Sequence, residues 1–137
     1  MISPETLRAE IKQLDELQQV LVRLIDVPKF RSNPVVCEIR NRFIEALERH
    51  LSHESTGVYR DFLASGDREM EKLANQFMES TRELHRILNK YKKNWCGREP
   101  GDQEEYVTET RALMHLMHER IETELTRLLP AMEQMTA

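Results

Sequence analysis

The apolar positions along the chain recur in steps of three and four, the spacing that places side chains on one face of an α-helix. They form four stretches, each with a single apolar stripe. The stripes are Leu7, Ile11, Leu14, Leu17, Leu21 and Ile25; Val36, Ile39, Phe43, Leu47, Leu51 and Val58; Met70, Leu73, Phe77, Leu84, Leu88, Tyr91 and Trp95; and Val107, Met114, Met117, Ile121, Leu125 and Leu128. The pattern therefore predicts four amphipathic helices.

Start and stop signals separate the first three helices. Ser3-Pro4 and Asn33-Pro34 each combine an N-cap residue with a proline at the first helical position, where its missing N–H is not needed. Pro28 marks the end of the first helix. Gly66 provides a left-handed stop for the second helix, and Asp67 can cap the third.

The segment 96–103 contains two glycines and a proline and forms the longest predicted loop, with Asp102 as the cap of the fourth helix. Pro130 marks the end of that helix or a late kink. Long helices joined by short connections bury their stripes most simply in an all-α, up-down-up-down four-helix bundle. We expect residues 1–137 to form this single domain.

Composition and charge narrow the range of functions. The 137 residues carry a net charge of −4 with the two signs interspersed, so no basic surface is expected to bind nucleic acid. No apolar run is long enough to cross a membrane, and Glu5 and Glu10 lie where a signal peptide would be basic and then apolar. Cys37 and Cys96 form no CxxC motif. We expect a cytoplasmic protein with reduced thiols.

Polar residues within the stripes are the candidate site. On a helical wheel centred on Leu47, Glu54 lies roughly 20° and His50 roughly 60° from the centre of the stripe, so both face inward. His53 points roughly 120° away and is expected to be solvated. A histidine and a glutamate four residues apart can bind one transition-metal ion.

Three further residues could complete a metal site. His118 and Glu124 flank the fourth stripe, each roughly 60° from Ile121, and His85 lies at the edge of the third. A metal-free interpretation stands beside this one, because a pair of His50 and Glu54 could satisfy itself, with the other residues at the bundle boundary. Arg40, near the centre of the second stripe, is expected to pair with an acidic residue.

The run His50-Leu51-Ser52-His53-Glu54, followed by Val58-Tyr59, resembles the His-Leu-x-x-Glu motif, with its trailing Leu-Tyr-Pro, of hemerythrin-like (HHE) cation-binding domains. The run 120–124, followed by Leu128-Leu129-Pro130, is similar to the corresponding run in branches that carry Arg in place of His. Trp95 matches a tryptophan at the end of the third helix. The resemblance covers nearly the whole chain and implies a bundle around a non-haem iron site.

The chain also departs from that family pattern. Ile11 occupies the place of the family's first histidine, and the paired histidines of the third helix are reduced to His85. The resemblance transfers His50 and Glu54, with Glu124 as a third residue, and His118 or Glu10 could complete the ligand set. Arg120 cannot ligate a metal and would oppose a second ion. We therefore expect one iron ion or none, and no di-iron centre.

A fainter resemblance links the helix around 51–63 to bacterial anti-sigma regulators of the stationary phase, which are also helical bundles. Two functions follow. The first is a hemerythrin-like domain with a reduced or lost iron site that binds or senses metal or oxygen. The alternative is a metal-free module that binds a regulatory protein or forms a homodimer. Because the sequence lacks a paired nucleophile and base and a glycine-rich phosphate loop, we do not expect an enzyme.

Overall fold

The computed structural model describes residues 2–95 and 103–136 of the chain. Its α-helices are α1 (Pro4–Ile25), α2 (Pro34–His53), α3 (Tyr59–Ala64), α4 (Arg68–Trp95), α5 (Gln103–Thr123) and α6 (Leu129–Thr136). A short 3₁₀ turn, η1 (Pro28–Phe30), follows α1, and two π-helical turns, η2 (Glu54–Val58) and η3 (Glu124–Leu128), connect α2 to α3 and α5 to α6.

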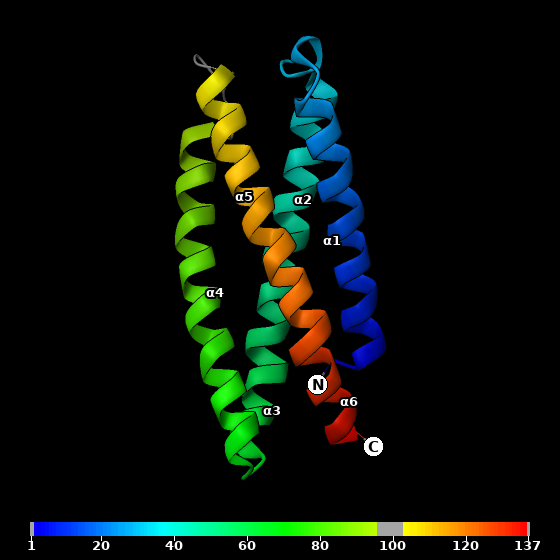
Figure 1. Cartoon of the computed structure of the whole chain (residues 1–137), viewed down its shortest axis with the longest axis vertical. Coiled ribbons are helices and arrows are strands. Elements are labelled where there is room, and N and C mark those ends of the chain that lie inside the picture. Colours follow the sequence, from blue (N-terminus) through cyan, green and yellow to red (C-terminus); the bar gives the residue numbers. More distant parts are fainter. Residues whose placement is uncertain (1, 96–102, 137) are drawn as a thin grey trace.

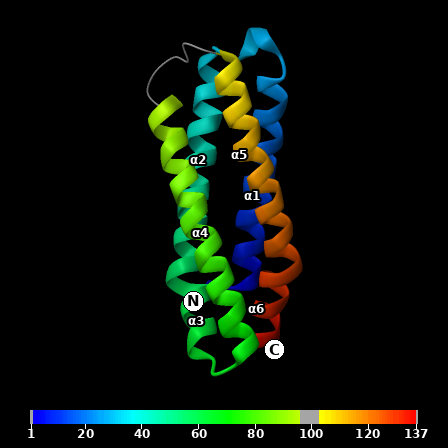
Figure 2. The same ribbon diagram turned by 60° about the vertical axis from the view of Figure 1, so that its left-hand side comes forward.

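The two π turns do not interrupt the rods in which they lie. The α2–η2–α3 segment runs as one rod and α5–η3–α6 as another, so with α1 and α4 they form four rods packed side by side (Figures 1 and 2). The predicted all-α four-helix bundle is confirmed. None of the described helices combines the length and the hydropathy that crossing a bilayer requires.

The N-cap side chains predicted for the first two helices form the expected hydrogen bonds. The Ser3 hydroxyl accepts a hydrogen bond from the Thr6 N–H at 3.1 Å, and the Asn33 side chain accepts one from the Val35 N–H at 2.9 Å. Gly66 has a φ of +76°, as a left-handed stop requires. The predicted cap Asp102 and the cysteine Cys96 lie outside the described residues.

Two predictions about the fourth rod need correction. Leu125 was expected in the stripe but is 42% exposed, because the π turn that begins at Glu124 turns this carboxylate inward in place of Leu125. For Pro130, predicted to mark either the end of the helix or a late kink, the first alternative is wrong, since α6 continues through it to Thr136. The proline is the second residue of α6 and directly follows the π turn η3, in which the helical hydrogen-bond pattern already changes.

Candidate metal centre

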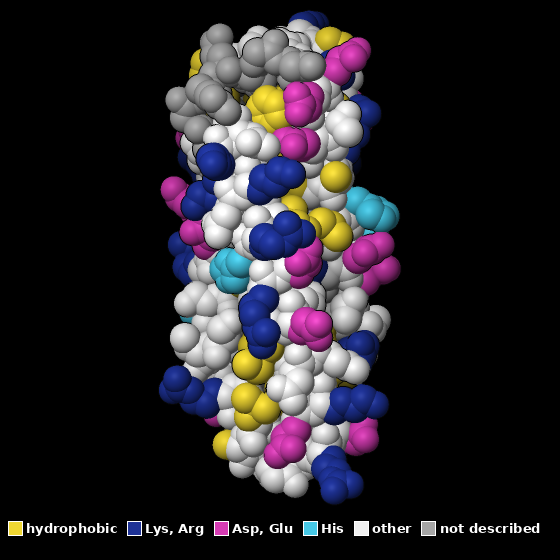
Figure 3. Space-filling view, turned by 90° about the vertical axis from the view of Figure 1, so that its left-hand side faces the viewer, with side chains coloured by type: hydrophobic (Ala, Val, Ile, Leu, Met, Phe, Trp, Pro, Cys, Tyr) yellow, Lys and Arg dark blue, Asp and Glu magenta, His cyan; other side chains and the backbone are white. Residues whose placement is uncertain are grey.

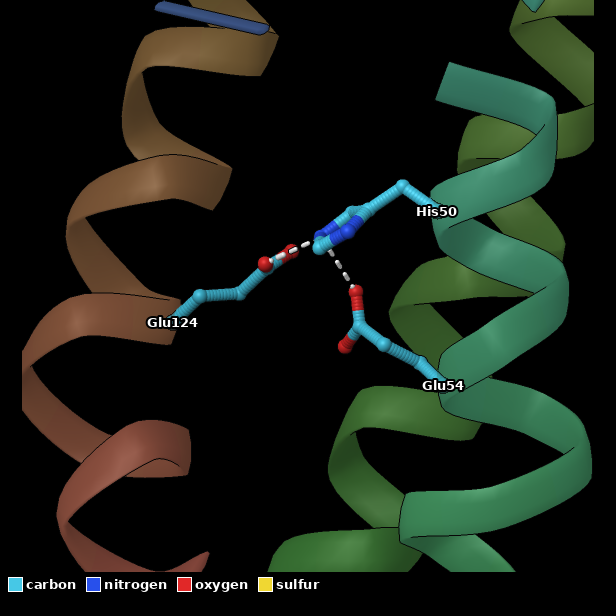
Figure 4. A group of neighbouring side chains, drawn as sticks. All are labelled: His50, Glu54 and Glu124. Atoms are coloured by element: carbon cyan, nitrogen blue, oxygen red, sulfur yellow. Dashed lines mark hydrogen bonds and ion pairs between the residues drawn. The ribbon is translucent and has the colours of Figure 1, made fainter. Parts of the chain in front are cut away.

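Three buried side chains from two rods meet at the middle of the bundle. His50 comes from α2, Glu54 from the start of η2 and Glu124 from the start of η3, and their exposed fractions are 1%, 0% and 1%. The His50 Nε2 atom lies 2.5 Å from Glu124 Oε1 and 2.8 Å from Glu54 Oε1 (Figure 4). One donor atom from each side chain lies within 4.8 Å of the others, the size of a site for a single ion.

The π turns contribute to this convergence. In each, the N–H group five residues on, from Tyr59 or Leu129, bonds to the carbonyl of the glutamate that starts the turn. Such a turn carries one residue more than an α-helical turn and re-aims the side chains around it. Both carboxylates of the site therefore occupy equivalent positions on their rods, four residues after His50 and Arg120.

The second ring nitrogen of His50 is held from a third rod. Its Nδ1 atom lies 2.8 Å from Oε1 of Glu10 on α1, and the other oxygen of Glu10 lies 2.5 Å from Nδ1 of His53. A carboxylate on the far nitrogen fixes the ring orientation and tautomer of a metal-binding histidine. His53 was expected to be solvated; its side chain is 42% exposed, yet it is tied to the site through Glu10.

Arg120 occupies the opposite side of the two carboxylates. Its Nε donates to Glu124 Oε2 at 2.7 Å, and its Nη2 lies 3.3 Å from Glu54 Oε2. Each glutamate thus directs one oxygen toward His50 and the other toward Arg120. The guanidinium also lies over the Phe77 ring, with its carbon 4.9 Å from the ring centre.

Hydroxyl groups complete the surroundings of the guanidinium. Nη2 of Arg120 donates to the Tyr59 hydroxyl at 2.6 Å and to the Thr81 hydroxyl at 3.0 Å, and Nη1 donates to the Ser80 hydroxyl at 3.1 Å. The Tyr59 hydroxyl in turn donates to Glu54 Oε2 at 3.0 Å. The outer oxygen of each carboxylate therefore accepts at least one hydrogen bond.

The environment shifts the pKa values of the three central groups in different directions. Burial would lower the pKa of His50, but hydrogen bonds to Glu10 and Glu124 and the close carboxylate of Glu54 raise it to about 12. Burial and the charge of Glu124 raise the pKa of Glu54. For Glu124 burial acts in the same direction, yet His50 and Arg120 outweigh it and lower its pKa. Without a metal, an imidazolium and a guanidinium balance the two central carboxylates.

One atom of the cluster remains unsatisfied. Glu54 Oε1 is buried and accepts no hydrogen bond, although it lies 2.8 Å from His50 Nε2. The contact is an ion pair rather than a hydrogen bond, because the single proton on Nε2 cannot serve two oxygens and Glu124 Oε1 is closer. A buried acceptor without a hydrogen bond costs about 1–3 kcal/mol, of which the ion pair with His50 offsets a part. A cation placed among the three side chains would remove that cost, so the donor set fits a metal ion.

The structure separates the predicted site residues into two groups. His50, Glu54 and Glu124 come together, whereas His118 is exposed and His85 half-buried, and neither belongs to the donor group. His85 and His118 lie at the edges of their stripes, where the adjoining face of the helix meets solvent.

The hydroxyl groups around Arg120 and the partner of Arg40 were not predicted from the sequence. Tyr59 lies five residues after Glu54, the span of one π turn, so the turn η2 brings its hydroxyl to the Glu54 carboxylate. Arg40 is buried but has no acidic partner among the described residues; its Nη1 lies 3.2 Å from the Tyr106 hydroxyl and its guanidinium carbon 5.6 Å from the centre of that ring. A phenol and its π face replace the expected carboxylate.

Comparison with known proteins returns no match to a family model, a curated protein or a solved structure. The resemblance to hemerythrin-like domains therefore rests on the short sequence motifs around His50 and Arg120 alone. The chemistry of the site has to follow from its own donors, their burial and their charges.

Proposed function

We propose that the protein is a metal-binding four-helix bundle that holds one divalent first-row transition-metal ion, such as iron, and acts in binding or sensing. One observation carries this proposal. The Glu54 oxygen that accepts no hydrogen bond lies in a fully buried position beside His50 Nε2 and Glu124 Oε1. Imidazole together with carboxylates suits iron, manganese and zinc, and the residues that would hold the ion are these three.

The arrangement around the donors supports the same proposal. Glu10 accepts from Nδ1 of His50, which leaves Nε2 to face the two carboxylates. Outer-sphere carboxylates of this kind raise the basicity of a ligating histidine and hold its ring in place. Glu10 would therefore be a positioning residue for the ion.

Arg120 limits the proposed site to a single ion. It takes the outer oxygen of Glu124 at 2.7 Å and approaches that of Glu54 at 3.3 Å, so a fixed positive charge occupies the place where a second ion would share the carboxylates. A guanidinium group cannot act as a metal ligand. A second ion would be repelled both by this group and by the first ion. A bound iron ion would supply ligand affinity and a redox response; we assign no reaction.

A metal-free module for protein interaction is the second candidate, and the charge balance of the core favours it. With His50 protonated, the two buried cations offset the two buried carboxylates without any ion. In that case the cluster would be a structural polar core, and the function would lie on the surface or in a homodimer.

Metal titration separates the two candidates. Metal-free protein would be titrated with Fe²⁺ under anaerobic conditions and with Co²⁺, and bound metal would be counted by elemental analysis after desalting. We expect one ion per chain in the wild type and at least a hundredfold weaker binding in His50→Gln. His118→Gln is the matched control and should bind as the wild type does.

Three results would contradict the proposal. Wild-type protein that retains no ion after desalting, with a melting temperature indifferent to chelator, would favour the metal-free module. Two ions per chain would contradict the limiting role of Arg120. A Co²⁺ absorption band that survives in His50→Gln would place the ion elsewhere.

A further inference from the structure

A cavity of about 280 Å³ opens between α4 and the α5–η3 rod, directly beside the proposed metal centre. Figure 3 views the α4 side of the molecule, where hydrophobic side chains are exposed among charged ones. The lining is mostly apolar, and the residues that matter here are Phe77, Ser80, Leu84, Ile87, Leu116 and Arg120. We call this cavity the α4–α5 groove.

Arg120 forms the partition between the groove and the metal centre. It is 5% exposed, and its Nε and Nη2 atoms are used by Glu124, Glu54 and Tyr59 on the inner side. Its Nη1 atom donates to Ser80, an exposed residue of the groove lining. Because Nη1 carries two protons and makes this one hydrogen bond within the described part of the chain, it can donate a second one.

The charges of the groove favour an anion at this point. Two glutamates belong to the lining, of which Glu83 is bonded to Arg86 at 2.5 and 3.1 Å, whereas Glu119 has only His115 as an ion-pair partner among the described residues, at 3.1 Å, on the exposed side of α5. Arg127 adds a second guanidinium to the lining. An anionic group that accepts the second proton of Nη1 would contact the Arg120 guanidinium directly, with the Ser80 hydroxyl 3.1 Å from the same nitrogen.

Metal binding would strengthen this preference. The metal-free cluster holds the His50 imidazolium and the Arg120 guanidinium against the carboxylates of Glu10, Glu54 and Glu124. A divalent ion that replaces the Nε2 proton of His50 would add one net positive charge, which would be only partly screened in a buried site. A carboxylate in the groove would offset it from the far side of Arg120.

We propose that the α4–α5 groove binds a small carboxylic acid with a short apolar chain, and that the ion and this acid bind cooperatively. The carboxylate would accept from Arg120 Nη1 and from the Ser80 hydroxyl. The chain would lie along Leu84, Ile87 and Leu116. The cavity is slightly smaller than most sites for drug-sized ligands, which suits an acid of about six carbons.

The cooperative part of this inference depends on the proposed metal function, whereas acid binding itself does not. Linkage requires that the ion tighten acid binding by the same factor as the acid tightens ion binding. Measured couplings of this type typically reach about 5- to 150-fold. A metal-binding sensor would gain a second input in this way.

The experiment uses hexanoate as the probe and its neutral counterpart hexanamide as the chemical control. Binding to the full chain would be measured by calorimetry and by amide chemical shifts, first without metal and then with one Co²⁺ per chain. We expect hexanoate to bind at least tenfold more tightly than hexanamide. We also expect Co²⁺ to tighten hexanoate binding about fivefold or more.

Filling the groove tests its location. Leu116→Trp, or Ile87→Trp if the first variant unfolds, should weaken hexanoate binding at least tenfold while circular dichroism and metal stoichiometry remain as in the wild type. Leu125→Trp introduces the same side chain at an exposed position outside the groove lining and should have no effect.

Each contrary result has a distinct meaning. If hexanoate binds neither the metal-free nor the Co²⁺-loaded protein, or binds Leu116→Trp as tightly as the wild type, the α4–α5 groove is not an acid-binding site. Equal binding of hexanamide overturns the role of the carboxylate. Hexanoate binding that Co²⁺ does not change overturns the coupling alone. A wild type that binds no Co²⁺ refutes the metal function, while acid binding to the metal-free chain still decides the groove.

Discussion

Replacing Arg120 with methionine should be the most damaging single change in the polar core. Methionine has a similar length and can still pack against Phe77, so the variant removes chiefly charge and hydrogen bonds. Glu54 and Glu124 would be left as two buried carboxylates that share His50 as their remaining cation.

The contacts of Arg120 set the expected magnitude. It bonds one buried carboxylate at 2.7 Å and approaches a second at 3.3 Å, and hydrogen bonds to charged groups contribute about 1.5–3 kcal/mol each. Removing one partner of a buried ion pair costs about 3–5 kcal/mol in other proteins. We therefore expect Arg120→Met to lower the free energy of unfolding by about 3–5 kcal/mol, a fall in melting temperature on the order of 10 °C or more.

Urea denaturation of the metal-free proteins at pH 7 measures this loss. Arg127→Met is the matched control, because Arg127 is exposed and its bond to Gln76 joins two surface side chains; its cost should be about 0.5 kcal/mol or less. Adding Glu124→Gln to Arg120→Met should restore part of the stability, since one unpaired charge disappears. A loss below about 1 kcal/mol for Arg120→Met, or a double variant less stable than the single one, would refute the reasoning.

Three further predictions concern the same core. The pKa of His50 is raised from 6.5 to about 12, so its protonation stabilises the folded metal-free protein. This stabilisation should be complete below pH 6.5 and be lost as the pH rises toward 12. Urea midpoints that stay level from about pH 6 to 9 would contradict this. Tyr59→Phe removes a donor to Glu54 and an acceptor for Arg120 and should cost about 1–3 kcal/mol in thermal or urea unfolding, whereas a neutral change would show that water replaces the hydroxyl. Arg120→His places a second histidine four residues before Glu124 and should raise the metal content from one to two ions per chain by elemental analysis; a content that stays at one would mean that more than this charge excludes the second ion.

The wheel positions predicted correctly that part of the buried cluster faces inward. The inward orientation of His50 and Glu54 followed from their angles to Leu47, because those angles are fixed within one helix. Glu124 entered the expected set through its motif and its wheel position, and the structure brings it against His50. The sequence could not show that Glu54 keeps an oxygen without a hydrogen bond, since that depends on which carboxylate lies closer to His50 Nε2.

The amino-acid sequence alone determined the four helices, their caps at Ser3 and Asn33 and the stop at Gly66, because periodicity, capping and left-handed turns involve neighbours within a few residues. Only the tertiary structure decided which side chains meet between rods. The contacts of Glu10 with His50 and of Arg40 with Tyr106 depend on how each rod is rotated and shifted along its neighbour. Those variables are set by packing of the whole core, and the π turns alter them further, so no local pattern specifies them.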